Sequence, residues 1–92
     1  MIVCEGDRCS VRGPLTMPHV TAVLAESVPL FKSPRVVVDL SGVTEVDSAA
    51  VSLLLEWRRE AAKANRNIEF ANLPASLRSL AELYGVLEFI GG

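Results

Sequence analysis

The side chains best placed for chemistry are a carboxylate and a hydroxyl at adjacent positions, Asp47 and Ser48. They follow a strand-like run of valines, Val36 to Val38, and open a segment of helical periodicity. A helix that begins there presents free backbone N–H groups and the positive end of its dipole, which favour an acceptor, an anion or a phosphorylated hydroxyl. Asp and Ser also begin many ordinary helices. The junction is therefore either a binding site or a helix cap, and composition alone favours the cap.

Other polar residues give little support for an enzyme. Ser48 lacks a base, since His19 is the only histidine, and it lacks the Gly-x-Ser-x-Gly elbow of hydrolases. Asp39 and Asp47 could form a carboxylate pair, but Asp39 follows three strand valines and is better suited to holding a neighbouring turn. The sequence has neither Gly-x-Gly-x-x-Gly nor Gly-x-x-x-x-Gly-Lys, so we expect no ATP hydrolysis and no cofactor.

The two cysteines, Cys4 and Cys9, flank a short turn signal. If Gly6-Asp7 is a two-residue hairpin turn, the cysteines lie directly opposite each other on paired strands. We favour two reduced thiols over a disulfide or redox switch, because we expect a cytoplasmic protein. A zinc site is less favoured still, since His19 adds only a third ligand at no familiar spacing.

The elements that position these residues predict an α/β fold with a mixed, mostly parallel β-sheet and an N-terminal β-hairpin, covered by about three to four helices. We expect one domain over residues 1–92. Its predicted elements are a hairpin over 1–5 and 8–12 ended by Gly13-Pro14, a helix capped by Thr16, a strand from Val36 to Leu40, a helix from about Asp47, a strand over 68–71, a helix from Pro74 to Gly85, and a short apolar strand or helical turn over 86–90.

Each predicted helix has an apolar stripe that should face the sheet. In the first helix the stripe is Val20, Val23, Leu24, Ser27 or Val28, and Phe31. In the second it is Ala50, Leu53, Leu54, Trp57, Ala61 and Ala64, and in the third Leu77, Leu80, Ala81 and Tyr84. Trp57 is therefore predicted to belong to the core. The opposite side of the second helix should be a solvated face, made of Ser52, Glu56, Arg59, Glu60 and Lys63.

Composition sets limits on partners. Half of the 92 residues are hydrophobic but only five are aromatic, so we expect a compact core with little room for an internal ligand cavity. The formal net charge of −2 disfavours nucleic-acid binding. No secretory signal is visible near Met1, and no stretch approaches the roughly 18 apolar residues of a membrane span. We expect a cytoplasmic protein that reaches a membrane only through a partner.

Three segments carry a family resemblance: Val-Asp-Leu-Ser-Gly-Val-Thr-Glu-Val-Asp-Ser-Ala-Ala-Val (38–51), Leu-Leu-Leu-Glu-Trp-Arg-Arg-Glu-Ala (53–61) and Phe-Ala-Asn-Leu-Pro-Ala-Ser-Leu-Arg-Ser-Leu-Ala-Glu-Leu-Tyr-Gly-Val (70–86). With the element order, they resemble the STAS domain, which sulfate transporters and anti-sigma-factor antagonists share. Its hallmark is a strand, a turn and an Asp-Ser or Asp-Thr start of the second helix. The resemblance covers nearly the whole chain, and residues 1–30 match in pattern only.

Within that family, the chain is most similar to the MlaB-type cytoplasmic subunits of lipid-asymmetry ABC transporters. This resemblance implies a non-enzymatic accessory subunit that binds the transporter's ATPase subunit and, through it, the permease at the inner membrane. The implied partner-binding surface centres on Asp47 and Ser48, with Ala49, Ser52 and the exposed side of the first helix alongside. Anti-sigma-factor antagonists usually have Asp-Ser-x-Gly, whereas Ala50 stands at the glycine position here, and Ala50 should narrow the room at the helix start while raising helix propensity.

Two other functions remain as alternatives. One is an anti-sigma-factor antagonist that phosphorylation of Ser48 would control, because an added charge of about −1.5 to −2 would expel a partner fitted to the neutral hydroxyl. The other is a small lipid carrier, which the small predicted cavity volume disfavours. Neighbouring transporter genes would support the accessory subunit, and a neighbouring serine kinase and sigma factor would support the antagonist.

Overall fold

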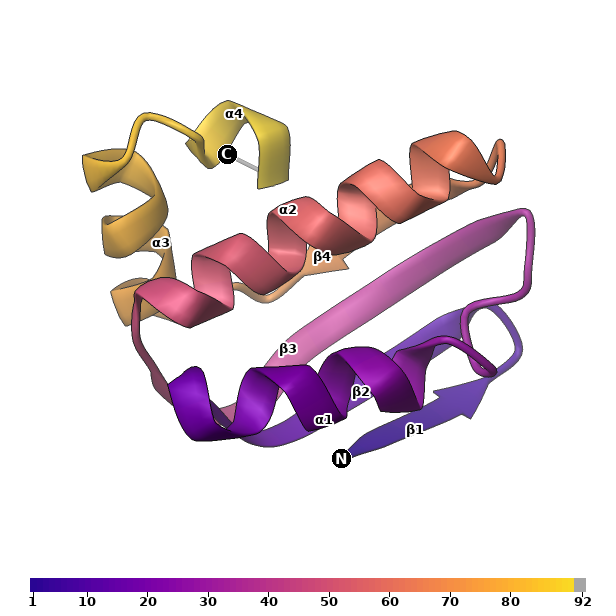
Figure 1. Cartoon of the computed structure of the whole chain (residues 1–92), viewed down its shortest axis with the longest axis horizontal. Coiled ribbons are helices and arrows are strands. Elements are labelled where there is room, and N and C mark those ends of the chain that lie inside the picture. The colour runs from indigo at the N-terminus through magenta and orange to yellow at the C-terminus, as the bar shows by residue number, and fades with distance from the viewer. Residues whose placement is uncertain (91–92) are drawn as a thin grey trace.

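The computed structural model describes residues 1–90, so Gly91 and Gly92 of the predicted domain lie outside the described residues. It contains a four-stranded sheet and four helices (Figure 1). The elements in chain order are β1 (Ile2–Glu5), β2 (Arg8–Leu15), α1 (Met17–Ser27), β3 (Arg35–Val46), α2 (Ser48–Lys63), β4 (Asn67–Ala71), α3 (Ala75–Leu83) and α4 (Leu87–Ile90). The predicted element order is confirmed, and the short final element is helical.

The sheet has the order β1-β2-β3-β4. β1 pairs antiparallel with β2, whereas β2 with β3 and β3 with β4 are parallel. The two crossovers, through α1 and α2, run in the same direction across the sheet, and right-handed connections then place both helices on one face. Figure 1 shows α1 and α2 side by side over that face. The predicted α/β fold class, with a mixed and mostly parallel sheet, is confirmed.

Only one face of the sheet is covered within residues 1–90. Side chains of β3 alternate, so that Val36 and Val38 are buried in the core while Val37 points to the other face and is half-buried. The prediction that these valines form a strand covered on both faces is therefore wrong. All-parallel sheets are covered on both faces because their crossover helices lie on both sides. Here both crossover helices lie on the same face of the sheet. The molecule has two layers, a sheet and a layer of helices.

The second and third strands run further than predicted. β2 continues through Gly13-Pro14 to Leu15, and β3 continues past Leu40 through Gly42 to Val46. Register shifts between the two strands accommodate the proline and the glycines, as bulges do. Gly13 has a φ of +93°, and a Cβ atom at Gly42 would lie 2.9 Å from the Arg12 side chain. These glycines therefore permit a kinked, closely paired extension rather than ending the strands.

The predicted helix stripes are largely confirmed, with three exceptions at helix ends. Val28 is exposed because α1 ends at Ser27, and Ala64 is exposed because it is the C-cap of α2. Tyr84, predicted to face inward, follows the last helical residue of α3 and is 51% exposed. Gly85 has a φ of +70° directly after this C-cap, which confirms it as the stop of the third helix.

Trp57 is a core residue, as predicted, with 3% of its surface exposed. Its Nε1 atom donates a hydrogen bond of 2.8 Å to Oγ of Ser27, and its ring packs against Phe31 with centroids 5.2 Å apart. Ser27 in turn donates to the backbone oxygen of Leu24 at 2.6 Å. The choice between Ser27 and Val28 for the inward position of α1 is thus settled in favour of Ser27. The indole joins α1 to α2 with its polar atom satisfied.

The predicted pairing of the N-terminal hairpin is confirmed, but the prediction that its two cysteines are reduced is wrong. Cys4 lies opposite Cys9 in the β1–β2 register, with Glu5 opposite Arg8. We expected reduced thiols, but the structure joins Cys4 to Cys9 in a disulfide. The facing positions of a short antiparallel pair bring the two Cα atoms to 4.0 Å, close enough for the sulfur atoms to meet.

Candidate functional site

Asp47 lies at the junction between β3 and α2 and is the N-cap of α2. Its Oδ1 atom accepts a hydrogen bond of 2.8 Å from the backbone N–H of Ala49. This bond satisfies one of the free donors in the first turn of the helix. The predicted helix start is confirmed. Because Asp47 supplies the cap, the hydroxyl of Ser48 is not needed for it.

The other carboxylate oxygen of Asp47 reaches α1. Oδ2 accepts a hydrogen bond of 3.0 Å from the backbone N–H of Met17, the first residue of that helix. Thr16 occupies the N-cap position of α1, but its hydroxyl shares a 2.8 Å hydrogen bond with Nδ1 of His19 and makes no capping bond. The prediction for Thr16 is therefore right about the position and wrong about the side chain, because Asp47 provides the acceptor instead.

The four predicted partner-binding residues lie together at the start of α2. Ser48 and Ser52 are exposed, one helical turn apart on the same face, whereas Asp47 and Ala49 are half-buried beside them. Ala50 points the opposite way and is fully buried in the core. Its methyl group therefore does not narrow the room at the exposed helix start, which corrects our expectation.

Ser48 and Ser52 form a ridge between two apolar grooves. The first groove, with a volume of about 360 Å³, lies between α1 and α2 and is lined by Met17, Val20, Thr21, Leu24, Ser48, Ala49, Ser52, Leu53 and Glu56. The second, of about 260 Å³, lies between α2 and the turn from α3 to α4 and is lined by Ser48, Val51, Ser52, Leu55, Tyr84 and Val86. We call Ser48 and Ser52 the serine ridge. A partner that covers the ridge can fill both grooves.

Large apolar side chains border this surface, and the sequence analysis, which placed the exposed side of the first helix in it, named none of them as binding residues. Met17 is 70% exposed beside the first groove and Tyr84 is 51% exposed beside the second. Exposed apolar residues that cluster around grooves are typical of protein-binding surfaces. The one sign of this exposed apolar surface in the sequence was that Met17 lies outside the apolar stripe, which begins at Val20.

Asp39 and Asp47 do not form a catalytic pair. The Asp39 carboxylate accepts hydrogen bonds from the backbone N–H of Ser41 at 2.9 Å and from the Asn72 side chain at 3.1 Å, and it pairs with Arg8 at 2.9 Å. These contacts, led by the Ser41 backbone N–H, hold the pKa of Asp39 well below its usual range. Asp39 thus ties β2, β3 and the end of β4 together, in keeping with the structural role predicted for it.

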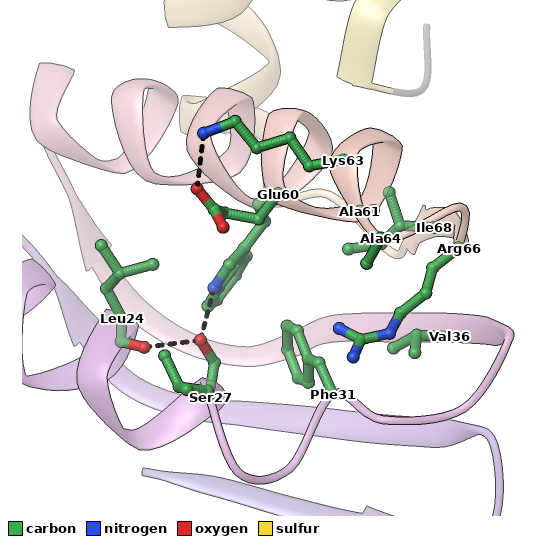
Figure 2. A pocket seen from close by; sticks show the side chains of 12 residues that line it. Leu24, Ser27, Phe31, Val36, Glu60, Ala61, Lys63, Ala64, Arg66 and Ile68 are labelled. Atoms are coloured by element: carbon green, nitrogen blue, oxygen red, sulfur yellow. Dashed lines mark hydrogen bonds and ion pairs between the residues drawn. The ribbon is translucent and has the colours of Figure 1, made fainter.

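A separate pocket of about 320 Å³ lies at the other end of α2 (Figure 2). Its lining residues come from the end of α1, the loop after it, the sheet and the last turns of α2: Leu24, Ser27, Val28, Phe31, Val36, Trp57, Glu60, Ala61, Lys63, Ala64, Arg66 and Ile68. We expected little room for an internal ligand cavity. This pocket leaves that expectation standing, because exposed residues such as Val28, Lys63 and Ala64 line it and it opens to the surface where α1 ends.

No helix within residues 1–90 is both long enough and apolar enough to cross a membrane. No group of three or more His, Cys, Asp or Glu side chains lies close enough together there to hold a metal ion.

Solved structures with the same fold are similar to this chain in geometry more than in sequence. The anti-sigma factor antagonist SpoIIAA in its unphosphorylated form matches with a TM-score of 0.75 and 17% identity, over 98% of this chain and 84% of that chain. A structure of Mglu matches with a TM-score of 0.63 and 22% identity, over 82% of this chain and only 20% of that chain. Its native form gives a TM-score of 0.58 and 20% identity, over 79% of this chain and 23% of that chain.

At these identities the solved structures bear on the fold alone, and family membership rests on the sequence. No curated protein sequence matches the chain. A family model described as "Mlab, STAS domain" matches residues 4–91, which include the end of β1, the whole of β2, the Asp47 junction and the serine ridge. The chain therefore belongs to the STAS-domain family, in the group that bears this Mlab description.

Proposed function

We propose that this STAS domain is a non-enzymatic accessory subunit of an ABC-type phospholipid transporter that maintains outer-membrane lipid asymmetry. It binds the ATPase subunit through the serine ridge and, through that subunit, associates with the permease at the cytoplasmic face of the inner membrane. The observation that carries the proposal is the ridge itself, a narrow polar strip between two apolar grooves. The Mlab description of the matching family supports the choice of partner.

The geometry of the ridge suits docking without chemistry. Ser48 and Ser52 are short, so a partner backbone can approach α2 closely while larger partner side chains enter the two grooves. Asp47 holds the starts of α1 and α2 together, so the groove between them is formed before binding. A preformed surface loses less conformational entropy on association.

The domain acts on the transporter by stabilising one of its states. If it binds the competent arrangement of the ATPase subunits more tightly than the others, that arrangement becomes more populated. The effect equals the difference in binding free energy between the states, and ATP hydrolysis then remains with the ATPase.

The test compares three substitutions at one position. Ser48→Ala removes only the hydroxyl and should weaken binding to the ATPase subunit by less than about threefold. Ser48→Glu and Ser48→Arg place a long charged group in a close contact, where its desolvation is uncompensated, and should weaken binding at least about tenfold. Affinities are measured by calorimetry with the purified ATPase subunit, and folding is checked by circular dichroism.

Ser79→Arg is the matched control, because Ser79 is an exposed helical serine outside both grooves. It should bind like the parent. If the three Ser48 variants also fold and bind like the parent, the junction is only a helix cap and the ATPase must dock elsewhere.

A second function, an anti-sigma-factor antagonist switched by phosphorylation of Ser48, has two observations in its favour. One is the fold shared with SpoIIAA, and the other is the exposed hydroxyl of Ser48 at a helix start. Transporter genes beside this one would favour the accessory subunit, whereas a serine kinase and a sigma factor would favour the antagonist. Phosphate incorporation at Ser48 by such a kinase, lost in Ser48→Ala, would support the second function.

A further inference from the structure

The pocket at the end of α2 is separate from the serine ridge. Ser48 begins α2 and Ala64 caps its other end, so a helix of this length separates these two residues by roughly 20 Å. Its volume of about 320 Å³ falls at the lower end of the range for ligand sites, about 300–1,000 Å³. Neither serine of the ridge lines it, and Leu24 is the one lining residue that it shares with the groove between α1 and α2. Ligand binding there can therefore be tested separately from docking on the serine ridge.

The deep part of the pocket is suited to an apolar ligand group. Phe31, Val36 and Ile68 supply apolar walls from the loop after α1 and from the sheet. The polar atoms nearby are already satisfied, since Trp57 Nε1 donates to Ser27 Oγ and Ser27 donates to the backbone of α1. A polar ligand group placed there would lose hydrogen bonds to water without finding a partner.

The rim carries a cation that has no ion-pair partner within residues 1–90. Glu60 is the only acid among the lining residues, and it pairs with Lys63 at 3.8 Å. None of the ion pairs found within residues 1–90 involves Arg66, whose side chain is half-buried. Figure 2 shows Arg66 pointing from the turn after α2 toward Phe31. A guanidinium in this place would gain from a planar anion such as a carboxylate.

We propose that this pocket binds a single-chain anionic amphiphile, namely a fatty-acid carboxylate, with its alkyl chain against Phe31, Val36 and Ile68 and its head group on Arg66. The small volume suits one chain rather than the two chains of a phospholipid. The charge arrangement selects an anion, because the other charged groups on the rim neutralise each other.

Trp57 makes the test direct, because it is the only tryptophan and lines the pocket. Titration of the whole domain with monomeric decanoate should change the Trp57 emission and saturate. Undecanoate and dodecanoate should bind more tightly, by about fourfold for each further methylene that enters the pocket. Decanol and decyltrimethylammonium, which have the same chain without the anionic group, should bind at least about tenfold more weakly than decanoate.

Two variants locate the ligand. Arg66→Gln should weaken decanoate binding about tenfold and leave decanol binding unchanged. Arg58→Gln is its matched control, since Arg58 is an exposed arginine of α2 outside the pocket, and should leave both affinities unchanged. Ala64→Phe should fill the mouth and abolish binding of every probe. Urea unfolding of each variant shows that the domain is folded.

Absence of a saturable response to decanoate would overturn the proposal. So would equal affinity for decanoate and decyltrimethylammonium, or binding that Arg66→Gln and Ala64→Phe leave intact. Binding to vesicles of anionic phospholipid without binding to monomeric decanoate would also overturn it, in favour of a membrane-surface contact.

Discussion

The carboxylate of Asp47 accepts a 3.0 Å hydrogen bond from the backbone N–H of Met17, 30 positions earlier in the chain. The same carboxylate caps its own helix through Ala49. One side chain therefore serves the starts of both α1 and α2, whose positive dipole ends face it. This double cap fixes one end of the groove beside the serine ridge, so folding and the proposed docking surface depend on the same residue.

Asp47→Ala should lower the free energy of unfolding by about 2 kcal/mol, because it removes two caps of about 1 kcal/mol each. Asp47→Asn keeps a single acceptor oxygen and should lose about half as much. Both are measured by urea unfolding. If Asp47→Asn is as stable as the parent, the second hydrogen bond of this carboxylate contributes nothing to stability.

Trp57→Ala should destabilise the domain by about 3–5 kcal/mol, since it empties a buried aromatic site. Ser27→Ala should cost about 1–3 kcal/mol, because the buried indole N–H then lacks an acceptor. In a Trp57→Phe background, where no donor remains, the cost of Ser27→Ala should fall by about 1 kcal/mol. Chemical unfolding of the four proteins of this cycle gives the coupling, and additive losses would contradict the hydrogen bond.

Asp39 should make stability depend on pH in the acid range. Its pKa is lowered in the folded protein from an ordinary value of 3.8, chiefly by the Ser41 backbone N–H and the Asn72 side chain. The stabilisation by Asp39 is therefore complete at pH values well above 3.8. It is lost as the pH falls toward the lower pKa of the folded state, because the unfolded chain takes up the proton first. The free energy of unfolding, measured across this pH range, gives the slope of stability against pH.

Asp39→Asn is the control for this pH dependence. At about pH 7 it should be less stable than the parent by about 2 kcal/mol, and the difference should shrink at about pH 3. Parallel stability curves for the two proteins would assign the acid sensitivity to other groups.

The domain alone should neither bind nor hydrolyse ATP, because its sequence has no glycine-rich phosphate loop. Calorimetric titration with Mg-ATP should give no heat of binding, and phosphate release should equal the buffer rate. The ATPase subunit serves as the positive control. Micromolar affinity for ATP would remove the basis for a non-enzymatic accessory role.

The sequence by itself determined the features that depend on near neighbours. Asp47 was predictable as a helix start because an N-cap side chain bonds within its own first turn. Trp57 was predictable as core from its place in an apolar stripe of period 3.6. The facing of Cys4 and Cys9 followed from a two-residue turn, and the stop at Gly85 from its positive φ.

Only the tertiary structure decided the features that join distant segments. The bond from Met17 to Asp47, the serine ridge between two grooves and the place of Arg66 on the pocket rim all require α1, α2 and the sheet to be packed together. The exposure of Tyr84 depends in the same way on where α3 ends and α4 begins. Periodicity and propensity describe residues within a few positions of one another, whereas these contacts arise from the packing of whole layers, which local patterns do not encode.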